Sequence, residues 1–335
     1  MPRRIGIAGF RGYSGAELVH LLKRHSGVEL VLLEHRHDAE SRPAPIGHEP
    51  THRVAATPDA AAAESISLVF LATPADVSME LTPGYLAKGI QVVDLSGAFR
   101  LRTGENYRRW YKEDHTCPDL LATAAYGLPE YCRKEIPSAQ LISNPGCYPT
   151  AANLAIRPLV DAKIVDRSAG IVCDAKSGVS GAGRKPSLKT SFCEVTENFS
   201  AYSILDHRHV PEVLLTSGLE EREFSFTAQL IPIDRGILET IYLRTVPGVS
   251  AERILEVYRE KYAAEPFVRL YKSGVVPDLR AVQRTNFCDI GFKFDAASGR
   301  AVIVSAIDNL VKGAAGQAIQ NMNLALGFPE SECLL

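Results

Sequence analysis

One cysteine stands where a thiol could act as a nucleophile. Cys147 lies in the segment Ser143-Asn-Pro-Gly-Cys-Tyr-Pro-Thr150, after a predicted strand at 140–143 and before a helix predicted to begin near Pro149. The N–H groups at a helix start stabilise a thiolate, which is the reactive form of cysteine. Most cysteines are small buried hydrophobes, as we expect of Cys173 in its apolar strand. The Asn-Pro-Gly turn instead favours an exposed nucleophile at position 147.

A nucleophilic thiolate needs an acid–base partner, and the densest candidates are two neighbouring histidines. The segment 206–212 reads Asp-His-Arg-His-Val-Pro-Glu, which places His207 and His209 on either side of Arg208. Imidazole exchanges protons near neutral pH, and arginine can hold an anion. A single histidine is more often structural, but two beside an arginine favour a catalytic role. The spacing does not decide which of the two takes the proton.

Residues from 177 onward form a stretch rich in glycine and hydroxyl groups, directly after a predicted buried strand. It reads Ser-Gly-Val-Ser-Gly-Ala-Gly-Arg. Backbone N–H groups in such turns form anion-binding nests, and Arg184 would add a cation for a phosphate group. The same composition also suits a flexible linker. Phosphate binding is the stronger hypothesis because two adjacent cations, Arg184 and Lys185, end the stretch directly after a buried strand.

A second glycine-rich turn, at 9–15, occupies the position of a nucleotide-binding loop. It follows a short apolar strand at 4–9 and precedes an amphipathic helix predicted over 16–24. Glycine lets the backbone approach a pyrophosphate, and the helix start offers N–H groups and the positive end of its dipole. Gly6, Gly9 and Gly12 follow the pattern G-x-x-G-x-x-G, because Ala8 occupies the position of the second glycine in the strict motif G-x-G-x-x-G. The prediction of a dinucleotide site therefore rests more on the position of the turn, between a strand and a helix, than on its residue pattern.

The residues after the second predicted strand, 28–33, bear on the choice of cofactor. Glu34 would accept a hydrogen bond from the ribose 2′-hydroxyl of NAD, whereas Arg36 would pair with the 2′-phosphate of NADP. The sequence favours NADP through Arg36, with a solvated charged loop as the alternative. No metal site is expected at His35 and His37, because no third ligand lies nearby.

The elements that must position these residues change in kind along the chain. Strand and helix patterns alternate up to about residue 148, which is typical of the βαβ units of a doubly wound parallel sheet. Later strands, at 224–230 and 288–294, alternate apolar and polar residues, which is typical of antiparallel sheets. We predict a dinucleotide-binding domain at 1–148 and an α+β domain at 149–311, with a C-terminal helix in 312–335 that packs back on the first domain.

Composition excludes several classes of protein. The 335 residues are 46% hydrophobic with a net charge of −2, so disorder and nucleic-acid binding are not expected. No apolar run is long enough for a membrane span, and no signal-peptide core is visible. Seven scattered cysteines without a Cys-x-x-Cys pair argue against disulfides or zinc. We expect a soluble, cytoplasmic enzyme that acts on small molecules.

Several longer motifs resemble those of N-acetyl-γ-glutamyl-phosphate reductases of arginine biosynthesis, which are related to aspartate-semialdehyde dehydrogenases. They occur in the family's order over nearly the whole chain: Gly9–Leu18, Asp94–Leu101, Tyr126–Glu130, Ser143–Thr150, Ser177–Arg184, Phe192–Glu194, His207–Glu212, Arg235–Leu238 and Asp308–Gln317. The resemblance implies a Rossmann-type doubly wound parallel sheet and an α+β catalytic and dimerisation domain with a mainly antiparallel sheet. It also implies a homodimer or homotetramer.

The activity implied by the resemblance is reduction of N-acetyl-γ-glutamyl phosphate to N-acetyl-glutamate 5-semialdehyde by NADPH, with release of inorganic phosphate. A Cys147 thioester would be the intermediate, and a histidine of the pair would donate the proton. The family relation assigns the catalytic residues Cys147, His207 and His209 and no metal ligand. The cofactor residues would be Gly9, Gly12, Tyr13, Ser14, Gly15, Arg36, Ser177, Gly178 and Asn309. The substrate residues would be Arg100, Asn144, Ser180, Gly181, Arg184, Glu194, Arg208 and Arg235.

Two segments depart from the family pattern. The small, serine-rich run after the second strand is replaced by Glu34-His-Arg-His37, and the next cofactor loop reads Ala72-Thr-Pro-Ala-Asp76. Three alternatives remain open at this point. They are a sister reductase for aspartyl or carrier-linked aminoadipyl phosphate, a non-catalytic NADP-sensing protein, and a thiol hydrolase.

Overall fold

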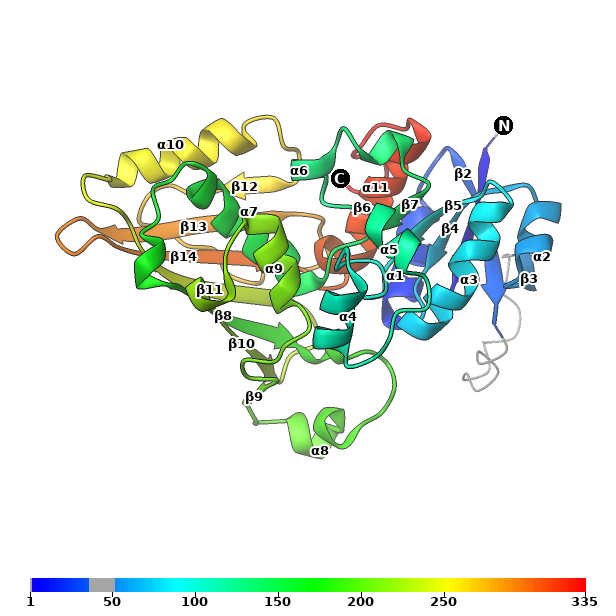
Figure 1. Cartoon of the computed structure of the whole chain (residues 1–335), viewed down its shortest axis with the longest axis horizontal. Coiled ribbons are helices and arrows are strands. Elements are labelled where there is room, and N and C mark those ends of the chain that lie inside the picture. The colour runs from blue at the N-terminus through cyan, green and yellow to red at the C-terminus, as the bar shows by residue number, and fades with distance from the viewer. Residues whose placement is uncertain (1, 36–51) are drawn as a thin grey trace. The chain divides into compact units, whose positions relative to one another are not determined.

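The computed structural model describes residues 2–35 and 52–335, so Arg36 lies outside the described residues. The chain divides into two compact units (Figure 1). The first unit combines Met1–Pro145 with Ala314–Leu335, and the second unit comprises Gly146–Gly313. No helix among the described residues is long and apolar enough to cross a membrane.

A parallel sheet forms the centre of the first unit. Its seven described strands lie in the order β3-β2-β1-β4-β5-β7-β6, and every pairing is parallel. The predicted doubly wound parallel sheet is therefore confirmed. The strands are β1 (Arg3–Ala8), β2 (Val28–Glu34), β3 (His52–Ala55), β4 (Ile66–Leu71), β5 (Gln91–Asp94), β6 (Ala125–Tyr126) and β7 (Leu141–Ser143).

Central strands of this sheet are buried on both faces, which explains their continuous apolar sequences. Ile5 and Ile7 in β1 and Leu68 in β4 have no exposed surface. The helices of the unit are α1 (Tyr13–Leu22), α2 (Pro58–Ala63), α3 (Ala75–Ala87), α4 (Gly104–Tyr111), α5 (Pro118–Thr123), α6 (Pro129–Cys132) and α11 (Gly316–Leu326), with a 3₁₀ turn η2 (Ile136–Ser138). The glycine turn between β1 and α1 therefore lies at the carboxyl end of a central strand.

The C-terminal helix α11 is held in the first unit by buried amide groups as well as by packing against α1. Asn321 donates to the carbonyl of Gly127 at 2.8 Å and to Oδ1 of Asn144 at 3.1 Å. Gln317 donates to the same Gly127 carbonyl at 3.1 Å. Because both amide side chains are fully buried, these hydrogen bonds fix the position of the helix.

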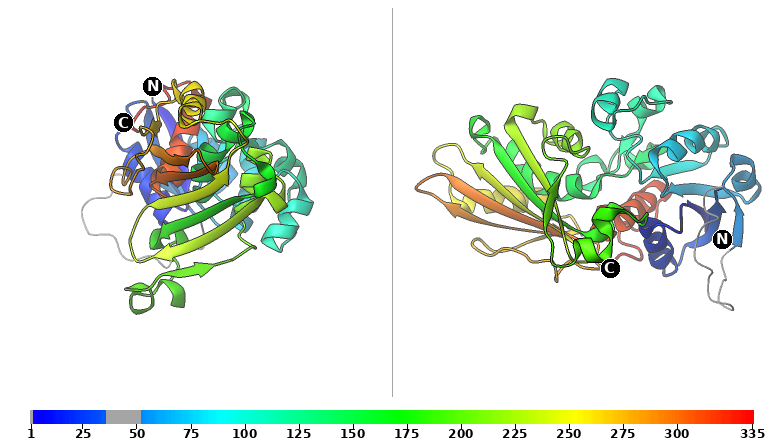
Figure 2. Two further views of the ribbon diagram at one scale, coloured as in Figure 1. Left: turned by 90° about the vertical axis from the view of Figure 1, so that its left-hand side faces the viewer. Right: turned by 90° about the horizontal axis from the view of Figure 1, so that it is seen from below.

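The second unit is built on a mixed sheet (Figure 2). Its seven described strands lie in the order β12-β13-β14-β11-β8-β10-β9, and antiparallel pairings predominate, as predicted. The strands are β8 (Ile171–Gly178), β9 (Ser200–Tyr202), β10 (Phe224–Ile231), β11 (Ile237–Arg244), β12 (Val268–Leu270), β13 (Cys288–Asp295) and β14 (Arg300–Ile307).

Strand β10 differs from the sequence-based expectation. Its alternating pattern favoured antiparallel neighbours, but it pairs in parallel with β8 over its whole length. The long connection between these strands, 179–223, provides the crossover that parallel pairing requires. Alternation reports that one face of a strand is buried, and it does not fix the direction of the neighbouring strand.

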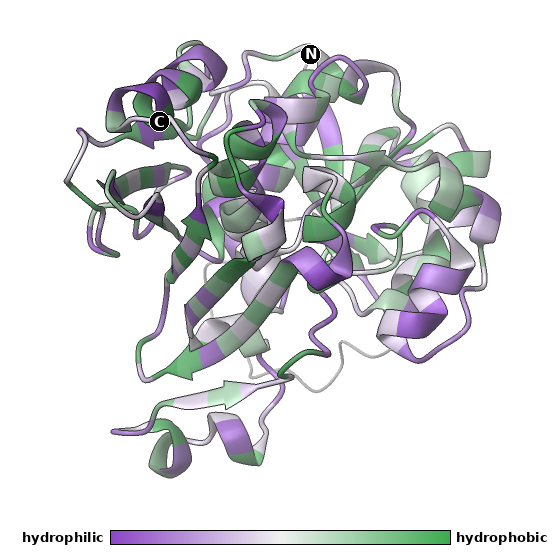
Figure 3. Cartoon of the chain, turned by 60° about the vertical axis from the view of Figure 1, so that its left-hand side comes forward, coloured by the Kyte–Doolittle hydropathy of each residue, from purple (hydrophilic) through white to green (hydrophobic). Residues whose placement is uncertain are grey.

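Helices cover the buried face of this sheet. Helix α7 (Cys147–Asp161) packs on β11 and β14, and α9 (Val210–Ser217) and α10 (Ala251–Tyr262) pack on α7. Figure 3 shows the alternation of hydrophobic and hydrophilic residues along the strands. The remaining short elements of the unit are α8 (Phe192–Val195), the 3₁₀ turns η3 (Arg167–Ala169), η4 (Val179–Ala182), η5 (Leu188–Thr190) and η6 (Glu221–Glu223). A π-helical turn, η7 (Val311–Ala315), leads into α11.

Candidate active site

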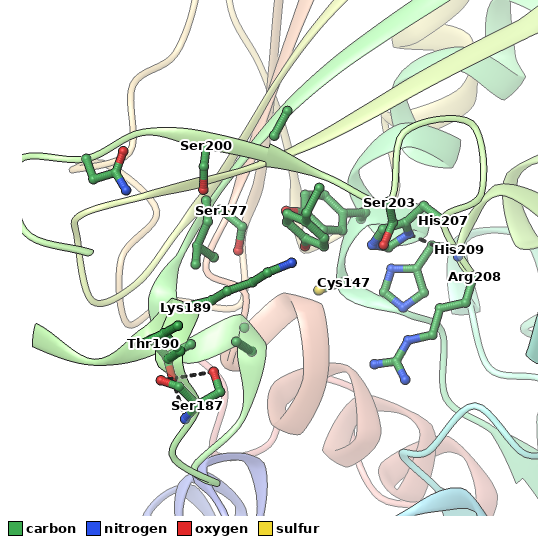
Figure 4. A pocket seen from close by; sticks show the side chains of 18 of the residues that line it. Cys147, Ser177, Ser187, Lys189, Thr190, Ser200, Ser203, His207, Arg208 and His209 are labelled. Atoms are coloured by element: carbon green, nitrogen blue, oxygen red, sulfur yellow. Dashed lines mark hydrogen bonds between the residues drawn. The ribbon is translucent and has the colours of Figure 1, made fainter. Parts of the chain in front are cut away.

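Cys147 is the first residue of helix α7, two residues earlier than the sequence predicted. Pro149 is tolerated inside the first turn because its missing N–H would have no partner there. The thiol is partly buried and lines a cavity of 690 Å³ within the second unit (Figure 4). The nucleophile predicted from the sequence therefore lies at a helix N-terminus and at the wall of a cavity large enough for a small metabolite.

Glycine is required next to the nucleophile. A Cβ atom on Gly146 would lie 2.7 Å from Nε2 of His209 and 2.9 Å from Oε1 of Glu212. The Gly146 N–H donates to Oε2 of Glu212 at 2.9 Å, and Glu212 is only 1% exposed. The buried carboxylate thus contacts both the N-cap of α7 and the catalytic histidine candidate.

His207 is a neutral side chain with a fixed tautomer. Its Nδ1 accepts a hydrogen bond from the backbone N–H of His209 at 3.2 Å, which places the ring proton on Nε2. Burial, together with the nearby Arg208 guanidinium, lowers the pKa of His207 to about 4. At neutral pH this imidazole can donate a hydrogen bond from Nε2, but it does not carry a positive charge.

His209 has different surroundings. Its Nε2 lies 4.0 Å from Oε1 of Glu212, and its ring packs edge-on against Tyr148 and His207. The Tyr148 hydroxyl is 3.1 Å from the Tyr202 hydroxyl, and burial raises the pKa of both phenols, so they stay neutral. A carboxylate at this distance can orient the imidazole during proton transfer. His209 is therefore the better candidate for the group that gives and takes a proton.

The cavity brings together part of the predicted site. The predicted residues that line it are Cys147, Ser177, Gly181, Glu194, His207, Arg208 and His209. Two further residues of interest were not predicted. Glu212 stands three residues after His209 at the start of α9, a spacing that could have identified it. Lys189 also lines the cavity, and no motif marks it.

Other predicted residues of the second unit form a separate polar cluster. Asn309 accepts a hydrogen bond from the Gly236 N–H at 2.7 Å and donates to Oγ of Ser180 at 3.0 Å. The Ser180 hydroxyl donates to the carbonyl of Asp234 at 2.6 Å. A Cβ on Gly178 would lie 2.6 Å from that carbonyl oxygen. These contacts hold the 234–236 turn against the end of β8.

Two predicted arginines of this unit also lie apart from the cavity lining. Arg235 is mostly buried, with Nη1 3.6 Å from Asp308 and Nε 3.7 Å from Asp234. Arg184 is exposed. Among the described residues, neither of them nor Gly178, Ser180 or Asn309 lines the cavity around Cys147, and their roles toward ligands stay predictions.

The predicted cofactor turn in the first unit has the geometry of a dinucleotide-binding loop. Gly9 has φ +76°, and a Cβ there would lie 2.3 Å from the carbonyl oxygen of Ala72. A Cβ on Gly15 would lie 2.2 Å from the carbonyl oxygen of Gly9. Gly12 is the N-cap of α1, whose first turn contains Tyr13 and Ser14. These residues fit a bound NADP, because a tight glycine turn and a helix N-terminus can accept its pyrophosphate.

The two predicted substrate residues of the first unit are engaged in structural contacts. Arg100 donates to the carbonyls of Asn144 and Leu95, each at 2.9 Å. The Asn144 amide donates to the carbonyl of Ala314 at 3.2 Å, and its Oδ1 accepts from Asn321. An oxyanion-binding role for Asn144 would require its amide to exchange that carbonyl for the substrate oxygen, so this role stays a prediction.

Known proteins match this chain over nearly its whole length. Residues 4–139 match the semialdehyde dehydrogenase NAD-binding domain, and residues 147–309 match the semialdehyde dehydrogenase dimerisation domain. The N-acetyl-gamma-glutamyl-phosphate reductase of Symbiobacterium thermophilum is 46% identical, over 100% of this chain and 98% of the relative. That of Pelotomaculum thermopropionicum is 44% identical, over 98% of this chain and 97% of the relative.

Solved structures support the same fold. Aspartate semialdehyde dehydrogenase II of Vibrio cholerae is similar with a TM-score of 0.71 at 16% identity, over 98% of this chain and 99% of that chain. The enzyme of Candida albicans, solved with NADP, gives a TM-score of 0.70 at 16% identity, over 97% of this chain and 99% of that chain. The predicted family is confirmed: the chain belongs to the semialdehyde dehydrogenases and, among them, to the N-acetyl-gamma-glutamyl-phosphate reductase family.

Proposed function

We propose that this chain reduces N-acetyl-γ-glutamyl phosphate to N-acetyl-glutamate 5-semialdehyde with NADPH and releases inorganic phosphate. One observation carries the proposal. A cysteine begins a buried helix at the wall of a cavity that also contains two histidines and an arginine, in a chain whose full-length relatives bear this reductase name. An acyl phosphate is reactive enough to acylate a thiol, and the resulting thioester accepts hydride where a carboxylate would not.

In the first step, Sγ of Cys147 attacks the acyl carbon. The carbon–sulfur bond forms, the carbon–oxygen bond to phosphate breaks, and phosphate leaves with the electron pair and takes up a proton. The N-terminus of α7 stabilises the attacking thiolate. Arg208, on the cavity wall, can neutralise one of the substrate's anionic groups.

The second step reduces the thioester. NADPH, when bound, supplies the hydride for the acyl carbon. His209 donates a proton to the oxygen of the tetrahedral intermediate. It accepts the proton again as the carbon–sulfur bond breaks, and this step releases the aldehyde and regenerates the Cys147 thiolate. Such acid–base help contributes about 10² to 10⁴ in rate. Glu212 lies beside this imidazole, with Oε1 4.0 Å from Nε2, where it can orient the ring.

The variant Cys147→Ser tests this mechanism. We expect turnover to be lost while NADPH still binds, as followed by nicotinamide fluorescence. Cys193→Ser is a matched control, because Cys193 is an exposed cysteine of the same unit. Unchanged turnover in Cys147→Ser would refute the thioester mechanism, and intact cofactor binding without any turnover in the wild type would favour an NADP-sensing protein.

The choice of substrate is tested in the reverse direction. Phosphate-dependent reduction of NADP is measured with N-acetyl-glutamate semialdehyde, aspartate semialdehyde and the carrier-linked aminoadipate semialdehyde. We expect activity with the first. Activity with aspartate semialdehyde alone would show that the chain is a sister reductase.

We propose further that the chain forms a homodimer or homotetramer through the outer face of the second sheet, and that it works in the cytoplasm. Val172 on β8 and Tyr242 on β11 are neighbours in register and are 46% and 45% exposed. A cytoplasmic location agrees with the absence of disulfides among all seven cysteines of the described residues. Tyr242→Lys should shift the mass by light scattering toward the monomer, and an unchanged mass would place the interface elsewhere.

A further inference from the structure

A π-helical turn that follows strand β14 packs against the candidate nucleophile, and the chemistry proposed above does not account for it. The backbone N–H of Gly313 in this turn, η7, donates to the carbonyl of Asp308, five residues earlier, at 2.9 Å. Hydrogen bonds of this spacing are rare in proteins and often occur at functional sites. The contacts of the turn point to a function connected with Cys147.

Gly313 is the residue of the turn that contacts Cys147. A Cβ atom on Gly313 would lie 2.8 Å from Cβ of Cys147 and 3.3 Å from its Cα, so a larger residue would displace one of the two segments. Gly313 is buried, and among the described residues it does not line the cavity, whereas Cys147 does. The turn therefore covers one side of the cysteine and leaves the thiol the side that faces the cavity.

The side chain of Asp308 holds the turn in place. Its Oδ1 accepts the backbone N–H groups of Leu310 at 2.8 Å and of Val311 at 3.2 Å. Its Oδ2 accepts the N–H of Arg284 at 2.6 Å, from another segment of the same unit. Asp308 has no exposed surface, so water does not compete for these donors. The carboxylate thus fixes the start of the turn through three backbone hydrogen bonds.

Two further contacts fix the turn and helix α7 within the second unit. Lys312 has no exposed surface, and its Nζ lies 5.6 Å from the ring centroid of the equally buried Phe267. Ser305, near the end of β14, donates from Oγ to the carbonyl of Ala151 in α7 at 3.1 Å. Since Asp308 directly follows β14, one strand carries both the residue that holds the turn and a contact to the helix of the nucleophile.

We propose that Asp308 and Gly313 are positioning residues for the nucleophile. Asp308 holds the π-helical turn, and Gly313, through its contact with Cβ, keeps the Cys147 side chain directed into the cavity. The inference rests on the proposed function, because it assumes that Sγ of Cys147 attacks the substrate. Displacement of a reacting atom by about 1 Å can cost about 10² in rate, so the loss of such a support is measurable.

Gly313→Ala and Asp308→Ala test the two parts of this inference. The first variant forces the turn and Cys147 apart, and the second removes the acceptor for the N–H groups of the turn. We expect kcat in the reverse direction to fall by about 10- to 100-fold in each variant, with both KM values and the NADPH affinity within about threefold of the wild type. The reason is that the thiol moves, whereas the groups that bind the ligands do not.

Alkylation of Cys147 by iodoacetamide is a second readout, and it does not depend on turnover. The rate is followed by mass spectrometry of the Cys147 peptide. At pH 7 we expect it to be about tenfold slower in both variants, since a displaced thiol loses the stabilisation of its thiolate by the helix N-terminus. An inactive wild type would contradict the proposed function, whereas the alkylation rates would still test the positioning.

Each variant has a matched control. Gly104→Ala also adds a methyl group to a glycine, but into open space. Asp289→Ala also removes a fully buried carboxylate of the second unit, one that pairs with Arg269 and accepts from the Tyr271 hydroxyl. We expect kcat and the alkylation rate of both controls to stay within about threefold of the wild type, although Asp289→Ala should lower the melting temperature.

The double variant shows whether the two residues act through one contact. If Asp308 acts through Gly313, the loss of kcat in the double variant should be clearly smaller than the product of the two single losses. Losses that multiply would show that the residues act independently, which would overturn the inference. Unchanged kcat and alkylation in both single variants would also overturn it, as would equal losses in Asp289→Ala.

A measurement on the wild type keeps the inference testable if the variants do not fold. Amide hydrogen exchange should show protection at Leu310, Val311 and Gly313, whose N–H groups are bonded to Asp308. Exchange at these amides as fast as in an unstructured peptide would show that the turn is not held, and the proposed support of Cys147 would be wrong.

Discussion

At the level of single residues, Glu212 connects the two reacting groups of the candidate site. One carboxylate oxygen accepts the N–H of Gly146, directly before the nucleophile, and the other lies 4.0 Å from Nε2 of His209. Its burial makes the charge effective, because little water screens it. A change of charge at this position should therefore alter proton transfer more than ligand binding.

Glu212→Gln should lower kcat by about 10- to 100-fold, in the range of general acid–base assistance, with little change in NADPH affinity. Loss of the carboxylate should also change the pH–rate profile, because Oε1 of Glu212 lies 4.0 Å from Nε2 of His209. Glu260→Gln, an exposed glutamate on α10, is the control. An unchanged pH–rate profile would reduce Glu212 to a structural role.

Lys189 is the cavity residue whose function the sequence left unmarked. Figure 4 shows its side chain extended toward Cys147, with His209 on the other side of the sulfur. Among the described residues its ammonium group makes no hydrogen bond or ion pair. It is therefore a candidate partner for the phosphate that leaves the acyl carbon, across the cavity from Arg208.

In the reverse direction, Lys189→Met should raise the KM for phosphate by about tenfold or more, as expected for loss of one charge-assisted contact, and leave the KM for the semialdehyde nearly unchanged. Lys185→Met is the matched control, because Lys185 is an exposed lysine of the same segment that does not line the cavity. Equal effects of the two substitutions would attribute the result to the general charge of the segment.

At the level of elements, both candidate sites contain a glycine at or shortly before a helix N-terminus. Because Gly146 has no Cβ, Glu212 and His209 can approach the start of α7. Gly9 adopts a left-handed conformation in the turn between β1 and α1. In each case the helix supplies N–H groups and a positive dipole end, and the glycine removes the Cβ that would block the approach. The turn at Gly9 is the simpler one to test.

Gly9→Ala should lower both the stability and the affinity for NADPH. The positive φ alone costs about 1 kcal/mol for alanine, and the new Cβ would meet the Ala72 carbonyl oxygen at 2.3 Å. Thermal denaturation and fluorescence titration measure the two effects. Gly104→Ala, at the start of α4, has open space around the new methyl group and should change neither. A normal melting temperature for Gly9→Ala would show that the turn can rearrange.

At the level of the whole molecule, two buried groups of the second unit make stability depend on pH in opposite directions. Burial lowers the pKa of His207 to about 4, so protonation opposes folding as pH falls from about 6.5 toward 4. Burial raises the pKa of Glu239, a carboxyl group beside the Cys173 thiol on the inner face of the sheet. Its ionisation in the unfolded chain opposes folding above its ordinary pKa.

Glu239→Gln isolates the second effect, because His207 is present in both proteins. The variant should match the wild type near pH 4 and become more stable than the wild type as pH rises to 8, since an amide has no proton to lose. Urea denaturation at pH 4, 6 and 8 measures the difference. A stability difference that does not vary with pH would show that Glu239 is ionised in the folded protein.

Local sequence patterns determined much of this protein. The apolar strands and the glycine turn predict the parallel sheet, and the Asn-Pro-Gly-Cys turn and the paired histidines predict the candidate reactive groups, because each signal lies within a few consecutive residues. The start of α7 and the parallel direction of β10 were missed, since a helix boundary and a strand neighbour depend on more than local periodicity.

Only the tertiary structure decided which distant residues come together around the candidate sites. Glu212 reaches Gly146 across 66 positions of sequence, and Gly313, at the end of the second unit, packs against Cys147 near its start. Lys189 enters the cavity from a segment without a motif, whereas Arg235 and Asn309, which lie in motifs, brace a turn. The physical reason is that side-chain contacts follow from the packing of whole elements, and residue type specifies what a group can do but not which partner it meets.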